Sequence, residues 1–183
     1  MELTRIKRFK RRVAPLAALA SLVVASAAHA DSDAHKLMLS GYEDTAAGPS
    51  LMAGRYDAVI KALGARGPSY QHDPIAASTN LCVAYIVTHQ WAAADPTCDA
   101  AVEAAKPAVG ATLFERKQHD ESVALAYSNR AVLHWLEDHP ELAASDFAVA
   151  RLLSPEAEFV SHNVAAFSSA KSAAAQAIVA GHS

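Results

Sequence analysis

The sequence predicts an all-α protein built from helical hairpins that stack on one another. Three observations indicate this class. Alanine is abundant, only 7 of the 183 residues are glycine, and runs of β-branched residues are short. Proline and glycine divide the chain into segments of helical length. Helix–turn–helix units also recur along the chain, which indicates an internal repeat.

The first 30 residues are predicted to be a cleaved signal peptide rather than part of the fold. Residues 5–12 hold six basic side chains, residues 13–27 form an uncharged apolar run, and Ala28-His29-Ala30 has the small-x-small pattern of a signal peptidase site. The apolar run is short for a transmembrane helix. The alternative to a cleaved signal peptide is an uncleaved membrane anchor. Cleavage after Ala30 predicts a periplasmic protein.

The remaining residues, 31–183, are predicted to form a single domain. The whole chain has 16 Lys and Arg and 19 Asp and Glu residues, of which the first 30 residues hold six basic and one acidic. The mature part therefore keeps 10 basic and 18 acidic residues, a net charge of −8. This balance argues against binding to nucleic acid and to an anionic membrane surface.

Breakers along the chain set the expected helix boundaries. A loop is predicted over residues 64–74 and a long connection over 106–118, each containing proline and glycine. The helices are expected over residues 75–89, from about 95 to 105, over 121–136, from 139 to before Ser154, and over 156–180. The chain is thus expected to be almost entirely helical.

The repeat is clearest over residues 124–157. Two helices approach closely when alanine-sized residues meet at their crossing and a large side chain fills the gap beside them. The residues that follow this pattern are Tyr127, Ala131, Ala143, Phe147, Ala150 and Pro155. On these residues the stretch resembles a tetratricopeptide repeat along its full 34-residue length. Arg130 and His134 depart from the residues usual at their positions.

Further copies of the same pattern flank this one. A second copy lies near residues 75–106, a degenerate copy near 40–66, and residues 158–180 would form a capping helix. The resemblance implies a short right-handed solenoid, similar to small exported repeat proteins of Gram-negative bacteria. A generic helical bundle with coincidental spacing is the alternative.

The two cysteines of the mature chain are a disulfide candidate. Cys82 and Cys98 are 16 residues apart, at the eighth and twenty-fourth positions of their repeat copy. These positions face each other across an antiparallel hairpin, so a bridge can form if the Cα atoms lie within ~7 Å. Two buried free cysteines that act as small hydrophobes are the alternative.

The three asparagines of the chain suggest a binding groove. Asn80, Asn129 and Asn163 all fall at the sixth position of a repeat copy, on the helices that line the concave face of such a stack. An asparagine amide can both donate to and accept from the backbone of an extended peptide. Helix–helix hydrogen bonding is the alternative role.

Other residues are expected to line the same groove. They are Thr79, Ser128 and Trp135, the last as an aromatic anchor or, alternatively, as a side chain packed on a neighbouring helix.

No catalytic, cofactor or metal site is predicted. Of the eight histidines after residue 30, His134 and His139 are five apart across a helix end and do not share a face. No motif pairs a base with a nucleophile. We therefore expect a non-catalytic periplasmic scaffold that binds a protein or peptide in its groove. The alternative is a protein that binds a small molecule or cell-wall fragment there.

Overall fold

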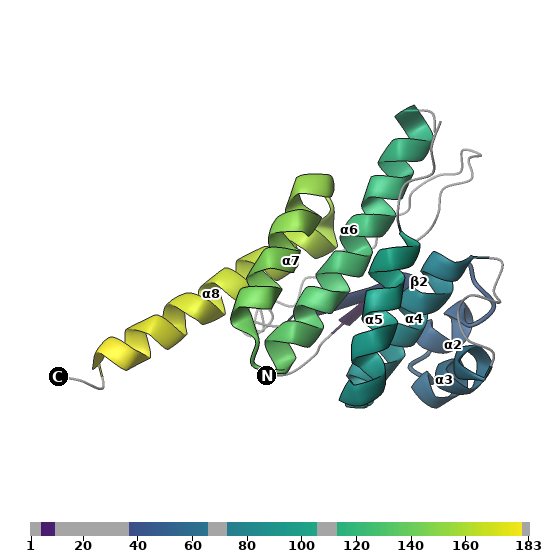
Figure 1. The fold of residues 1–183 in the computed structure, drawn as a ribbon, viewed down its shortest axis with the longest axis horizontal. Helices are drawn as coiled ribbons and strands as arrows, with labels where there is room; N and C mark the ends of the chain where they lie inside the picture. The colour runs from purple at the N-terminus through teal and green to yellow at the C-terminus, as the bar shows by residue number, and fades with distance from the viewer. Residues whose placement is uncertain (1–4, 10–36, 66–72, 106–112, 181–183) are drawn as a thin grey trace, which may run out of the picture.

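The computed structural model describes residues 5–9, 37–65, 73–105 and 113–180, and within them the chain is mostly helical (Figure 1). This confirms the predicted predominance of helix. The elements are β1 (Arg5–Phe9), β2 (Met38–Tyr42), α2 (Gly48–Met52), α3 (Tyr56–Gly64), α4 (Pro74–Val87), α5 (Trp91–Ala104), α6 (Leu113–Leu136), α7 (Pro140–Leu153) and α8 (Glu158–Ala180).

The helices pair as hairpins, α4 with α5 and α6 with α7, and α8 packs on both α6 and α7. Small residues lie where the paired helices meet: Ala131 on α6 and Ala143 on α7 are fully buried, and Phe147 is 2% exposed beside them. This is the close-packed crossing that the sequence predicts. Helix α8 then extends beyond the hairpins towards the C-terminus (Figure 1).

The turn after the first helix of each pair has the same backbone geometry. Gly54, His89 and Asp138 adopt positive φ angles of 70°, 56° and 62°. The next amide donates to a carbonyl five residues back: Arg55 to Ser50 at 2.9 Å, Gln90 to Tyr85 at 2.9 Å, and His139 to His134 at 2.8 Å. This is a Schellman motif. It recurs after α2, α4 and α6, so the short pair α2–α3 repeats the geometry of the two longer hairpins.

Two helix boundaries differ from the prediction. Helix α6 begins at Leu113, so part of the expected 106–118 connection is helical, while residues 106–112 lie outside the described residues. Helix α2 begins at Gly48 and places Pro49 in its first turn, where a missing N–H removes no helical hydrogen bond. The pair Gly48-Pro49 therefore starts this helix, within the copy of the repeat that the sequence identifies as degenerate.

The two short strands were not predicted from the sequence. The five residues of β2 are all buried, and β1 runs parallel to β2 with Arg5 opposite Met38 and Phe9 opposite Tyr42. Strand β1 lies in the predicted signal peptide, most of which falls outside the described residues. The cleavage site after Ala30 also lies outside them and stays a prediction.

The helices were compared with the length and hydropathy of membrane-spanning helices. Within the parts of the chain that the structure describes, no helix combines the length and apolar character needed to cross a membrane.

The predicted disulfide is present. Cys82 on α4 and Cys98 on α5 are bonded, with their Cα atoms 4.9 Å apart. Both residues are buried in the main hydrophobic core, at most 1% exposed, beside Val83 and Ala94. The bridge therefore ties the two helices of one hairpin together inside the core.

Removing this bridge should destabilise the protein. Closing a 16-residue loop is worth about 3 kcal/mol in the chain-entropy model. We expect Cys82→Ala/Cys98→Ala to lower the free energy of unfolding by about this amount, measured by urea denaturation. Reductant should lower the midpoint of the natural chain but leave the double variant unchanged, because no other cysteine is present. An unchanged midpoint of the natural chain in reductant would contradict the expectation.

Candidate functional site

Strand β2 lies against three helices that come from successive parts of the chain. It contacts α4, α6 and α8, which each contribute one buried asparagine. Every residue from Met38 to Tyr42 is buried. The groove that the sequence predicts on these helices therefore holds an extended segment of the same chain.

Each asparagine binds the main chain of one residue of β2 through both ends of its amide. Asn163 accepts from Met38 N at 2.6 Å and donates to Met38 O at 2.8 Å. Asn129 does the same with Ser40, at 3.0 and 2.7 Å. Asn80 does so with Tyr42, at 2.7 and 2.9 Å. We call these three asparagines the asparagine ladder.

The ladder takes the place of a neighbouring strand. Alternate residues of a strand point their N–H and C=O groups to the same edge, with a repeat of about 6.6 Å. The three amides are spaced to meet Met38, Ser40 and Tyr42 in turn, and they satisfy six main-chain groups at once. All six interactions involve the main chain, so the ladder recognises an extended backbone rather than particular side chains.

Further contacts orient the amides. Asn163 Nδ2 also donates to Ser128 Oγ at 2.9 Å, and Asn80 Nδ2 to Thr45 Oγ1 at 2.9 Å. Close approach of the strand requires Gly41, since a Cβ at that position would lie 2.8 Å from Asn80 Oδ1 and against the side chain of Leu51. The strand therefore reaches the ladder only because one of its residues lacks a side chain.

The structure brings most of the predicted groove residues to one place. Ser128 supports the ladder, and Thr79 is fully buried, with no hydrogen-bond partner for its hydroxyl among the described residues. Trp135 is half-buried and packs edge-to-face on Phe167 of α8, with ring centroids 5.0 Å apart. Its place in the structure is thus a helix–helix contact.

Sequence reasoning missed the segment that occupies the groove. Strand β2 carries only five residues, and its partners are 38, 89 and 125 positions away. The equal repeat positions of the asparagines indicated an extended backbone as their partner, but nothing in the sequence identified residues 38–42 as that backbone.

Arg130 lies next to Asn129 and binds groups on α5 and α7 rather than on β2. Its Nε and Nη2 donate to the two oxygens of Asp146 on α7 at 2.7 and 2.9 Å, and Nη1 donates to Asp99 on α5 at 2.7 Å. Hydrogen bonding to Asp146 raises the pKa of the Arg130 guanidinium above its ordinary value. This ion-pair network joins α5, α6 and α7.

A separate surface pocket of about 430 Å³ lies away from the ladder. The start of α6 and the turn between α7 and α8 form it, and its lining includes Arg116, Lys117, Asp120 and Glu121. Charged side chains of both signs line this open pocket. It is therefore not the closed apolar site that a small-molecule binder would use.

Comparison with known proteins gives no relative for the chain. None of the family models, curated proteins or solved structures searched matches it. Functional inference therefore rests on the asparagine ladder and the elements around it.

Replacing Asn129 should loosen the central point of the ladder. Asn129→Ala leaves the buried N–H and C=O of Ser40 without the partners they have here, which should cost about 2–4 kcal/mol of unfolding free energy in urea denaturation. The amide of Ser40 should also exchange with solvent faster. As a control, Ser161→Ala removes only an exposed local bond and should change stability by less than about 0.5 kcal/mol. Equal stability of the two variants would contradict the assigned role.

Proposed function

We propose that the chain is a non-catalytic, exported interaction module of the tetratricopeptide-repeat type, which binds an extended protein segment by adding it as a strand to β2. Three features support the repeat assignment: the recurring Schellman turns, the hairpin pairs α4–α5 and α6–α7, and the buried alanines at the α6–α7 crossing.

The observation that carries the proposal is that the asparagine ladder forms hydrogen bonds with only one edge of β2. Because alternate residues of a strand face opposite edges, the main-chain groups of Leu39 and Gly41 point away from the asparagines. In the full chain β1 occupies that second edge, in a parallel register that sets Ile6 opposite Leu39. A strand held firmly on one side and able to pair on the other is a template for strand addition.

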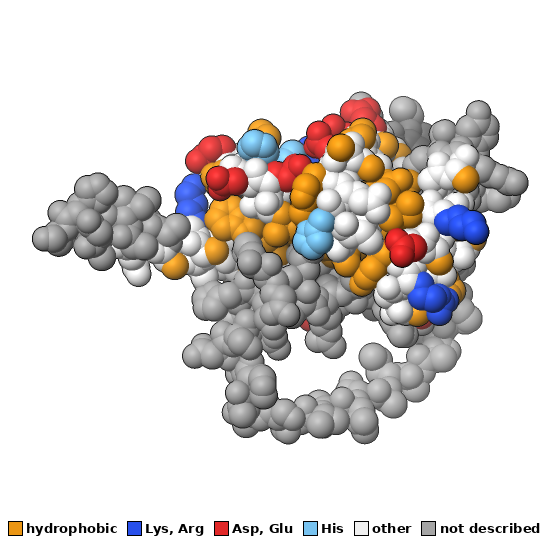
Figure 2. All heavy atoms as spheres, turned by 90° about the horizontal axis from the view of Figure 1, so that it is seen from below, with side chains coloured by type: hydrophobic (Ala, Val, Ile, Leu, Met, Phe, Trp, Pro, Cys, Tyr) orange, Lys and Arg blue, Asp and Glu red, His pale blue; other side chains and the backbone are white. Residues whose placement is uncertain are grey.

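Export would open this second edge. Cleavage after Ala30 removes β1 and leaves the rest of the chain with a net charge of −8. The segment that β1 contributes, RIKRF, is basic. Figure 2 shows that acidic side chains also outnumber the basic ones on the face it draws. Charge complementarity therefore favours a basic extended segment as the partner.

A periplasmic location is part of the proposal. The basic start, the apolar run and Ala28-His29-Ala30 support export, and the Cys82–Cys98 disulfide suits an oxidising compartment. The alternative, a small molecule or cell-wall fragment bound in the groove, gains no support, because the three asparagines already bind the main chain of the buried strand β2.

A synthetic peptide of residues 3–11 tests strand addition to the chain that begins at Asp31. In the parallel register, Leu39 and Gly41 bond with the main-chain groups of Lys7, whereas those of Ile6 and Arg8 face away. We expect the unmodified peptide to bind saturably in fluorescence anisotropy. N-methylation at Lys7 should weaken binding at least about tenfold, because one blocked hydrogen bond and a steric clash both disrupt pairing.

The control peptide carries the same methyl group at Ile6. Its charge and length equal those of the Lys7 peptide, so it should bind like the unmodified peptide. Equal weakening by both methyl groups would indicate attraction by charge alone. Absence of binding by all three peptides would reject strand addition at this edge.

A further inference from the structure

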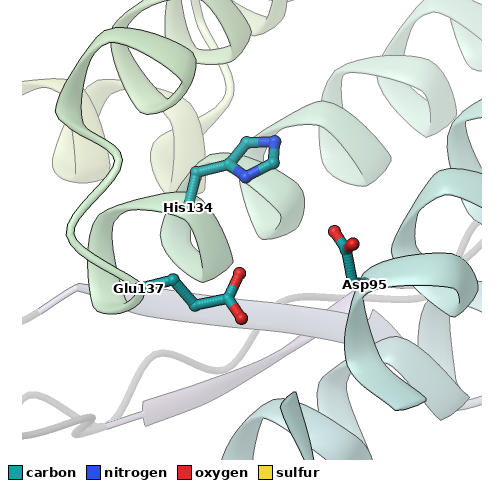
Figure 3. Close-up of side chains that lie close together, drawn as sticks. All are labelled: Asp95, His134 and Glu137. Carbon is teal, nitrogen blue, oxygen red and sulfur yellow. The ribbon is translucent and has the colours of Figure 1, made fainter. Parts of the chain in front are cut away.

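Three side chains with metal-binding atoms meet where the first long hairpin contacts the second. Asp95 lies on α5, His134 in the last turn of α6, and Glu137 directly after α6. One ligand atom from each lies within 4.8 Å of the others. Figure 3 shows the imidazole of His134 and both carboxylates turned towards a common space. We call these three residues the α5–α6 cluster.

The imidazole of His134 provides an observation independent of this proximity. Its Nδ1 is buried and has no hydrogen-bond partner among the described residues. Figure 3 shows the ring edge that carries this nitrogen facing Asp95 and Glu137. A buried nitrogen with an unused hydrogen-bonding capacity costs free energy unless a ligand or water engages it. The ring therefore faces a position that no side chain of the described residues fills with a hydrogen-bond partner.

The other ring nitrogen lies near a carboxylate that has a fixed position. His134 Nε2 lies 3.6 Å from Asp146 Oδ2, and Arg130 fixes that carboxylate through two hydrogen bonds. A carboxylate beside Nε2 favours the tautomer with its proton on Nε2, which leaves the Nδ1 lone pair free. In metal sites a carboxylate that accepts from the second imidazole nitrogen orients the ring, and a small movement of His134 would bring Nε2 within hydrogen-bonding distance of Asp146.

We propose that the α5–α6 cluster binds one divalent transition-metal ion, with Zn²⁺ as the best match. One imidazole nitrogen and two carboxylate oxygens suit Zn²⁺ at about 2.0–2.2 Å and leave a fourth position for water. Ligands around a tetrahedral ion lie about 3.4 Å apart, so small side-chain rotations of the exposed Asp95 and the half-buried Glu137 would complete the site. The two carboxylates also balance the charge of the ion.

A bound ion would join two hairpins that share no covalent link at this point. Asp95 belongs to the α4–α5 hairpin, and His134 and Glu137 belong to α6 and its turn. The ion would therefore fix the angle between the hairpins and stabilise the folded state relative to the unfolded chain. This inference is independent of strand addition at β2.

Calorimetric titration of the full chain with Zn²⁺, after treatment with EDTA, tests the site. We expect one ion per chain and a rise in Tm on Zn²⁺ addition. Asp95→Asn and Glu137→Gln keep the side-chain shapes and should each weaken binding at least about tenfold. Mg²⁺, which prefers oxygen ligands in an octahedral arrangement, should bind far more weakly.

Asp138→Asn is the matched control. It removes the same charge from the residue next to Glu137, on an exposed side chain outside the cluster, and asparagine tolerates the positive φ angle found there. This variant should bind Zn²⁺ and gain Tm like the natural chain. Zn²⁺ binding that is absent, or equally strong in all three variants, would overturn the proposal, and loss in Asp138→Asn as well would reduce it to general charge attraction.

Discussion

The arrangement of the hairpins depends on the pairing between three buried amides and the main chain of β2. Each helix that contributes an asparagine must present it at the height of one strand residue, since an unpaired buried peptide group is costly. The strand thereby sets how α4, α6 and α8 lie relative to one another, although it makes up only five residues. Gly41 belongs to the same constraint, because it sets how closely the strand can approach Asn80.

Helix α6 connects this constraint to the rest of the molecule. Asn129 faces the strand, while the adjacent Arg130 binds Asp99 and Asp146 on the two neighbouring helices. His134, one turn further along, faces the same carboxylate as Arg130. One helix thus carries a backbone-binding face and a charged face. Asn129, which binds β2, and His134, which belongs to the α5–α6 cluster, therefore lie on the same helix.

Local and periodic features could be predicted from the sequence, and long-range pairing could not. The helices were predicted because propensity and breakers act within a few residues, and the Cys82–Cys98 bridge because the repeat places both residues at one level of a hairpin. The equal repeat positions of the asparagines predicted that they would act together. Strand β2 was missed because its stability comes from partners up to 125 positions away. The nearness of Asp95 to His134 likewise arises only from the packing of α5 on α6.

The order of the asparagines along the chain also sets an order of assembly. Tyr42 meets its partner after 38 residues, Ser40 after 89, and Met38 only after 125. As the chain is synthesised from its N-terminus, the C-terminal end of the strand can pair first and its N-terminal end last. The last pairing, between Met38 and Asn163, requires α8, which lies close to the end of the sequence. The strand can therefore pair progressively from Tyr42 back to Met38. Contacts between residues this far apart in the sequence are entropically expensive and slow to form. The α4–α5 and α6–α7 hairpins can therefore form before Met38 pairs with Asn163.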